Sequence, residues 1–199
     1  NILEVASKSA VQFVVGTNRD ENKLWSAFDP RLADADASTW EKSSTETFGS
    51  RAAEARNVYE KLRPNESHKD LISAVSTDTG FRQRAISFAE QRVSVSQPTW
   101  MYWFTWPSPA MGGVIGCCHA LDIPFAFDNL HVENISMLTG DGTERAGIAD
   151  RFASEIAAFA THSHPSWSQF NTNNRPTLVI DTETHLAHDP EPEIRVLFV

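Results

Sequence analysis

The sequence predicts an α/β fold, and three observations support this prediction. Short apolar runs with the composition of buried strands occur at residues 11–16, 99–106, 176–181 and 193–199. Amphipathic segments of helical period separate the first three runs. Two of the runs are followed by a polar or glycine-rich loop that carries an acid or a histidine. Because active sites of open α/β sheets lie at the carboxyl ends of the strands, a site is expected at these two loops.

Helices are predicted wherever apolar residues recur at three- and four-residue spacing. Four segments have this pattern, at residues 45–62, 68–76, 78–93 and 146–160. Pro64 ends the first, and Asp78 is a plausible N-cap of the third. Residues 31–45 are polar and rich in Ser and Thr, which predicts a surface loop.

The stretch from Gly112 to Phe127 is the most unusual in the chain, and it follows the run at 99–106. Glycine adopts backbone conformations that other residues avoid, so a loop rich in glycine can present a side chain that an ordinary turn cannot. This loop carries a single histidine, His119, with an acid three residues later at Asp122. We interpret His119 as a general base.

A histidine base needs a partner that holds its ring, and a carboxylate on the second ring nitrogen serves this purpose. Glu21, in the polar loop after the first strand, is the candidate, and the adjacent Asp20 competes for the role. Spacing alone favours a solvated glutamate and a structural histidine. The pairing of Glu21 with His119 is therefore a hypothesis that needs further support.

The aromatic residues of the run at 99–106 are expected to pack in the core, and three of them are tryptophans. Trp103, together with Met111 in the following loop, is a candidate for the border of an apolar acyl or alcohol pocket near His119.

Composition argues against several kinds of partner. The chain of 199 residues has 17 Lys and Arg against 26 Asp and Glu, a net charge of −9, and no basic run. Binding to nucleic acid or to an anionic membrane surface needs clustered cations, so neither is expected. No apolar run is long enough to span a bilayer.

Metal and disulfide chemistry are not expected either. The two cysteines, Cys117 and Cys118, are adjacent, a spacing that fits neither an ordinary loop-closing disulfide nor a structural zinc site. Two histidine pairs, 162 with 164 and 185 with 188, lie in polar segments without a further ligand at a recognised spacing.

Three segments of the chain resemble type-B carboxylesterases, the family of the cholinesterases and para-nitrobenzyl esterases. Residues 14–21, VVGTNRDE, are similar to the segment that carries the family's acid. Residues 102–127 are similar to its histidine segment, and residues 159–195 to its last helix and strands. The resemblance implies an α/β-hydrolase fold, with a mixed, mostly parallel sheet flanked by helices. It also implies that Glu21 is the acid and His119 the base. Asp122 falls where the family has an acidic residue near the histidine, so it either supports the histidine or packs the loop, and packing is the favoured interpretation.

The sequence departs from that family in three places. Asn22 replaces the usual glycine after the acid, and both the G-x-S-x-G nucleophile motif and the glycine-rich oxyanion loop are absent from the chain. In the family the serine precedes the acid and the histidine. The resemblance therefore implies that residues 1–199 are the C-terminal portion of a carboxylesterase domain, incomplete and inactive without an N-terminal portion of the same protein.

Two functions are compatible with these residues. The first is a serine carboxylesterase that hydrolyses small-molecule carboxylic esters through an acyl-enzyme, without metal or organic cofactor. The second is a non-catalytic, cholinesterase-like binding or adhesion module. The presence of both Glu21 and His119 favours the enzyme, because a module without catalysis has no chemical use for the pair.

Overall fold

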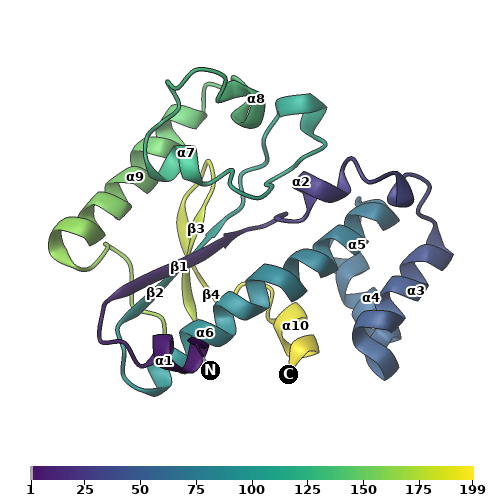
Figure 1. Ribbon diagram of the computed structural model, residues 1–199, viewed down its shortest axis with the longest axis horizontal. Helices are drawn as coiled ribbons and strands as arrows, with labels where there is room; N and C mark the ends of the chain where they lie inside the picture. Colours follow the sequence, from purple (N-terminus) through teal and green to yellow (C-terminus); the bar gives the residue numbers. More distant parts are fainter. Residues whose placement is uncertain (1) are drawn as a thin grey trace.

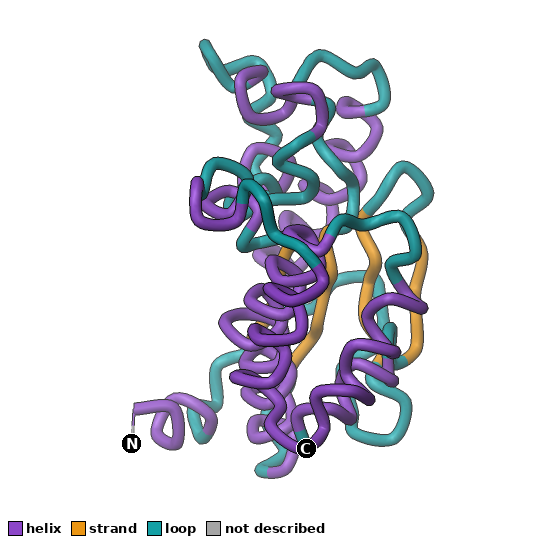
Figure 2. The backbone as a smooth tube through the Cα atoms, turned by 90° about the vertical axis from the view of Figure 1, so that its right-hand side faces the viewer, coloured by secondary structure: helices purple, strands orange, loops and turns teal. Residues whose placement is uncertain are grey.

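Four strands form one mixed sheet at the centre of the computed structural model, which describes residues 2–199 (Figure 1). The strands are β1 (Phe13–Asn18), β2 (Thr99–Phe104), β3 (Pro176–Ile180) and β4 (His185–His188), in that spatial order. β1, β2 and β3 run parallel, and β4 pairs antiparallel with β3. Figure 2 shows the strands side by side, in orange. The predicted α/β fold, with a mixed and mostly parallel sheet, is confirmed.

Helices cover both faces of this sheet. The helices are α1 (Ile2–Ser7), α2 (Lys23–Ser26), α3 (Ala37–Phe48), α4 (Ala52–Leu62), α5 (His68–Thr77), α6 (Gln83–Ser94), α7 (Ile123–Ala126), α8 (Ser136–Thr139), α9 (Arg145–His162) and α10 (Pro192–Arg195). Met101 of β2 packs with α6 on one face, whereas Trp100 and Phe104 pack with α7 and α9 on the other. Alternation along β2 thus buries both faces of the strand, as the apolar run at 99–106 predicts.

A separate helical layer is formed by α3, α4 and α5, at the right of Figure 1. Its core contains Trp40, Tyr59 and Leu71. The prediction of a surface loop over 31–45 is wrong over most of its length, because Asp36 caps α3 through a hydrogen bond that its carboxylate accepts from the Thr39 backbone N–H. The prediction of a single helix over 45–62 is also wrong, because α3 ends at Gly49, which has φ 55°, and α4 starts at Ala52.

Asp78 is not an N-cap. Helices α5 and α6 are joined by a π-helical turn, Asp78–Arg82, that keeps the chain helical. The Asp78 carboxylate is buried and accepts a hydrogen bond of 2.7 Å from the Tyr59 hydroxyl. Burial raises the pKa of Asp78 to about 6, and the Tyr59 hydrogen bond together with the nearby arginines opposes that rise.

The chain ends in a helix and not in the predicted strand over 193–199. Pro192 opens α10, and a 3₁₀ turn at Val196–Phe198 follows. Ile194 and Leu197, three residues apart, pack into the core of the helical layer. The last strand is instead β4, whose side chains are largely exposed and which is held by backbone pairing with β3.

Candidate active site

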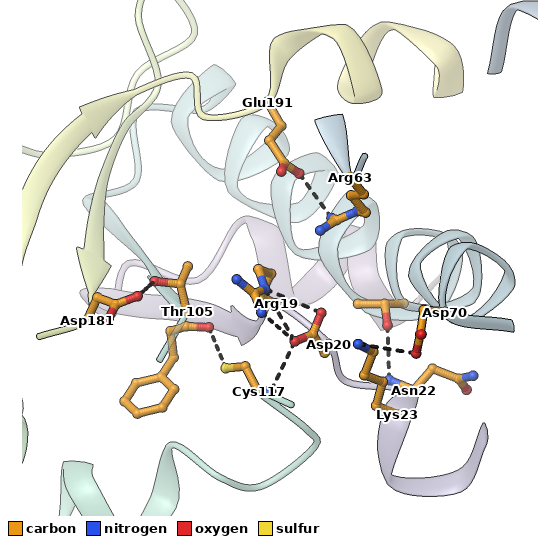
Figure 3. Close-up of polar contacts among 12 residues, drawn as sticks. Arg19, Asp20, Asn22, Lys23, Arg63, Asp70, Thr105, Cys117, Asp181 and Glu191 are labelled. Atoms are coloured by element: carbon orange, nitrogen blue, oxygen red, sulfur yellow. Dashed lines mark hydrogen bonds and ion pairs between the residues drawn. The ribbon is translucent and has the colours of Figure 1, made fainter. Parts of the chain in front are cut away.

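Two loops leave the sheet side by side at the carboxyl ends of β1 and β2. The Arg19 backbone N–H donates to the Phe104 carbonyl over 2.9 Å, directly beyond the last paired residues of the two strands. The Asp20 N–H donates to the Cys117 carbonyl, and the Cys117 N–H donates to the Asp20 carboxylate, each over 2.9 Å (Figure 3). The loop that carries the acid and the loop that carries the histidine are therefore joined through their backbones.

The structure brings Glu21 and His119 together. The Nδ1 atom of His119 lies 2.6 Å from Oε2 of Glu21, and the other carboxylate oxygen accepts a 2.8 Å hydrogen bond from the Asn18 N–H. The His119 N–H also donates to the Glu21 carbonyl over 3.2 Å. Because a carboxylate faces Nδ1, that nitrogen carries the ring proton of the neutral imidazole and Nε2 is left as the acceptor.

Solvent exposure differs sharply within this pair. The side chain of Glu21 is 7% exposed and that of His119 is 44% exposed. Burial raises the pKa of the Glu21 carboxyl, and the hydrogen bonds from the Asn18 N–H and from His119 oppose the rise. The buried charge of Glu21 thus has two donors, one from the backbone and one from the imidazole.

Asp20, the competing acid, has other partners. Its carboxylate forms an ion pair of 3.0 Å with Arg19 and accepts the Cys117 N–H (Figure 3). Burial alone would raise the pKa of Asp20, but the Arg19 charge and these hydrogen bonds hold it below its ordinary value. Of the two adjacent acids, Glu21 is the one in contact with the histidine.

Asp122 lies beside the pair and is held by two donors. Its Oδ2 atom accepts a 2.7 Å hydrogen bond from the Tyr102 hydroxyl, and its Oδ1 atom accepts a 3.1 Å bond from the Asn18 side-chain amide. Burial and the nearby Asp122 carboxylate raise the pKa of Tyr102, so its hydroxyl stays a proton donor.

Two aromatic rings that the sequence did not indicate flank the His119 ring. The centroids of Trp25 and Phe81 lie 5.2 and 5.4 Å from that of His119, and the two aromatic rings stack at 6.4 Å with an interplanar angle of 13°. Trp25 follows Glu21 by four residues, which is a weak signal. Phe81 belongs to the π-helical turn, which the helical periodicity does not reveal.

A hollow of about 420 Å³ opens beside the imidazole. Its lining residues are Gly16, Thr17, Glu21, Gly80, Phe81, His119, Ala120, Asp122 and Ile123. Trp103 and Met111, the two candidates for a pocket border, are not among them. Trp103 is buried with the Arg82 guanidinium 4.1 Å above its ring, and Met111 is 56% exposed beside a different hollow that it shares with Met137.

The two cysteines lie in the loop that carries His119. Cys117 and Cys118 are buried free thiols, and burial raises the pKa of Cys118 to about 11. Within residues 2–199, no group of three or more His, Cys, Asp or Glu side chains is arranged to hold a metal ion. None of the described helices combines the length and apolar character that crossing a bilayer requires.

Comparison with known proteins identifies relatives with a common chemistry. A family model described as the carboxylesterase family matches residues 1–195. The chain is 29% identical over 203 residues to a para-nitrobenzyl esterase of Bacillus subtilis (strain 168), covering 94% of this chain and 37% of that protein. It is 27% identical over 176 residues to a phenmedipham hydrolase of Pseudarthrobacter oxydans, covering 88% of this chain and 33% of that protein.

Solved structures with the same fold are also esterases. A thermophilic para-nitrobenzyl esterase superposes with a TM-score of 0.73 at 25% identity, over 99% of this chain and 40% of that one. A Geobacillus stearothermophilus carboxylesterase superposes with a TM-score of 0.83 at 21% identity, over 99% and 42% of the two chains, which supports the α/β-hydrolase fold. The chain thus spans little more than a third of the length of its curated relatives.

Proposed function

We propose, since this chain belongs to the carboxylesterase family, that it supplies the acid and the base of a Ser–Glu–His triad in a serine carboxylesterase. The observation that carries the proposal is the 2.6 Å contact between His119 Nδ1 and the buried Glu21 carboxylate, with the imidazole half-exposed beside a hollow. The nucleophilic serine and the oxyanion donors lie outside these residues. Residues 1–199 are one portion of a single catalytic domain in this proposal, and the other portion of the same protein is its partner.

The proposed mechanism follows from the orientation of the imidazole. Nε2 of His119 accepts the proton of the serine hydroxyl as that oxygen attacks the ester carbonyl. Glu21 keeps the remaining ring proton on Nδ1 and stabilises the imidazolium that forms. His119 then returns the proton to the leaving alcohol, which yields an acyl-enzyme, and a water molecule activated by the same imidazole releases the acid. This chemistry uses neither a metal ion nor an organic cofactor.

The proposed substrates are small carboxylic esters with an apolar group. Trp25 and Phe81 offer aromatic surface directly beside the imidazole, where an acyl or alcohol group of the substrate would lie. The names of the two curated relatives, a para-nitrobenzyl esterase and a phenmedipham hydrolase, support substrates that contain aromatic rings.

A non-catalytic binding module is the second candidate. The buried Glu21 argues against it, because a buried carboxylate aimed at an imidazole serves catalysis and is not required for binding a partner. Upstream sequence discriminates between the two, since a G-x-S-x-G motif belongs to the enzyme alone.

Hydrolysis of p-nitrophenyl acetate by the full-length protein tests the proposal. His119→Ala is expected to lower turnover at least about a thousandfold, with an unchanged circular dichroism spectrum. His162→Ala, at the exposed end of α9, is the matched control and should keep wild-type activity. Turnover by His119→Ala at the wild-type rate would overturn the triad, and a full-length wild type without any esterase activity would favour the binding module. The 199-residue chain alone should not hydrolyse the ester.

A further inference from the structure

We propose that Asn18 is a positioning residue for the Glu21–His119 pair, which it orients through Asp122 and the backbone on both sides of the histidine. The inference rests on the proposed function of that pair. Asn18 is the last residue of β1 and is only 1% exposed, so its side chain lies inside the junction of the two loops.

Three hydrogen bonds connect Asn18 to Glu21 and to the residues on the two sides of His119. Its backbone N–H donates to the Glu21 carboxylate over 2.8 Å. Its side-chain amide donates to the Cys118 carbonyl over 2.7 Å and to the Asp122 carboxylate over 3.1 Å. Cys118 directly precedes His119, and Asp122 follows it by three residues. One side chain therefore holds the chain on both sides of the base while its backbone holds the acid.

Tyr102 completes the arrangement from the neighbouring strand. Its hydroxyl donates to the second oxygen of Asp122 over 2.7 Å. The ring reaches this position by crossing Gly16 of β1, where an added Cβ would overlap it, and it packs against Phe152 at 4.9 Å between centroids. Asp122 thus has one donor from β1 and one from β2, and its carboxylate has little freedom to move.

The backbone beside His119 explains why such restraint is needed. Ala120 has φ +65°, a left-handed conformation that a residue with a Cβ adopts at a cost of roughly 1–2 kcal/mol. Without a restraint, the segment between Cys118 and Asp122 would relax toward ordinary backbone angles and turn the imidazole away from Glu21. The Asn18 amide bridges the two ends of this strained segment.

The donor end of the Asn18 amide carries this role. Two acceptors surround Nδ2, whereas Oδ1 has no hydrogen-bond partner in the part of the chain that the structure describes. An aspartate in this place has the same shape but presents a charged oxygen to a carbonyl and to a second carboxylate. Shape and donor capacity can therefore be separated by substitution.

The experiment compares Asn18→Ala and Asn18→Asp in the full-length protein, with ester turnover as the first measurement. Asn18→Ala is expected to lower kcat about 10- to 100-fold, the factor that corresponds to one lost hydrogen bond to a charged group, with KM changed by less than about threefold. Asn18→Asp should be at least as severe although it preserves the packing. Asn174→Ala, in an exposed loop, is the control and should leave kcat unchanged.

Tyr102→Phe provides a milder variant that keeps the ring and removes only the hydroxyl. Its kcat should fall by less than that of Asn18→Ala, because Tyr102→Phe removes one hydrogen bond and Asn18→Ala removes two. Since both side chains act through Asp122, the loss in the double variant with Asn18→Ala should be smaller than the product of the two single losses. Losses that multiply fully would show that the two residues act independently and would overturn the inference.

A second measurement does not depend on hydrolysis. The short Nδ1–H···Oε2 contact should give a low-field proton resonance of His119, assigned by its absence in His119→Gln. Asn18→Ala and Asn18→Asp should broaden or abolish this resonance, while thermal unfolding shows that the variants are folded. An unchanged resonance, or a milder effect of aspartate than of alanine, would overturn the positioning role. Absence of ester turnover in the wild type would overturn the proposed function instead, and the resonance would still decide the role of Asn18.

Discussion

Replacing Glu21 by glutamine is the sharpest perturbation of the proposed pair, because it removes the charge and keeps the shape. One carboxylate oxygen accepts the Asn18 N–H over 2.8 Å, and the other faces His119 Nδ1 over 2.6 Å. A glutamine has a single acceptor oxygen for these two donors. Its NH₂ group must therefore point either at the Asn18 N–H or at the imidazole.

Both orientations should disable the base. If the NH₂ group faces His119, Nδ1 must become the acceptor, the ring proton moves to Nε2, and the nitrogen that should take the serine proton is blocked. If it faces Asn18, one buried donor is unpaired, which costs about 1–3 kcal/mol, and the imidazolium lacks its counter-charge. We expect kcat to fall by roughly 10³- to 10⁴-fold, the effect of the corresponding change in a Ser-His-Asp triad.

Stability should respond far less than activity. Burial raises the pKa of Glu21, which means that the folded protein disfavours its charged form. Removing the charge relieves this penalty and offsets the lost hydrogen bond, so the free energy of unfolding should change by less than about 1 kcal/mol. A large loss of turnover with little loss of stability would distinguish a functional carboxylate from a structural one.

The assay is the kcat of the full-length protein for p-nitrophenyl acetate, together with urea unfolding. Glu66→Gln is the matched control, because burial also raises the pKa of Glu66 and its carboxylate has no contact with His119. This control should keep kcat within about twofold of wild type. A kcat of Glu21→Gln within about tenfold of wild type would refute the reasoning, and a severe loss in Asp20→Asn at the same time would assign the acid to Asp20.

Two further predictions concern stability, measured in the same full-length protein. Ala120→Gly should raise the urea midpoint or leave it unchanged, because Ala120 has φ +65° and glycine adopts this conformation without strain. Ala157→Gly, on the exposed side of α9, is the control and should lower the free energy of unfolding by about 1 kcal/mol. A clear loss of stability in Ala120→Gly would contradict the proposed strain at this position. Burial raises the pKa of Asp78 to about 6, so the folded state binds the carboxyl proton more tightly than the unfolded state does. The free energy of unfolding should therefore fall by about 1.4 kcal/mol per pH unit as the pH rises from about 4 to about 6. Asp78→Asn should remove this component of the slope, and an unchanged difference between pH 4 and pH 6 would show that Asp78 titrates normally.

The strands that the sequence predicted correctly are those with a continuous run of apolar side chains. The runs at 11–16, 99–106 and 176–181 correspond to β1, β2 and β3. In β2 and β3 burial on both faces demands apolar residues at nearly every position, whereas the apolar residues of β1 are half-buried. β4 and α3 were missed for the opposite reason. β4 is held by backbone pairing at the edge of the sheet, and α3 is polar on most of its surface and starts at the Asp36 cap. Neither has the apolar pattern that reveals an element.

At the site, the sequence predicted which residues meet but not how they are held. Position after two strands, together with the resemblance, indicated Glu21 and His119. Asn18, Trp25 and Phe81 contact the pair from segments whose proximity depends on the parallel register of β1 and β2 and on the π-helical turn. Periodicity along one segment does not determine the register between two segments that are distant in the chain. Asn18, Trp25 and Phe81 therefore could not be predicted from the sequence, whereas the resemblance did indicate Asp122.

The register of β1 against β2 sets the distance between the loop that carries the acid and the loop that carries the histidine. Asn18 and Phe104 are the last paired residues of β1 and β2, and the hydrogen bonds from the Arg19 and Asp20 N–H groups extend the contact into the loops. The contact ends with the His119 N–H on the Glu21 carbonyl, so main-chain hydrogen bonds, together with the Asp20 carboxylate on the Cys117 N–H, hold the acid near the base. The side chains of Asn18 and Asp122 then restrain the angle of the imidazole. Substitutions around the ring should therefore reduce turnover without separating the loops, whereas only changes that shift the register of β1 against β2 should move the acid away from the base.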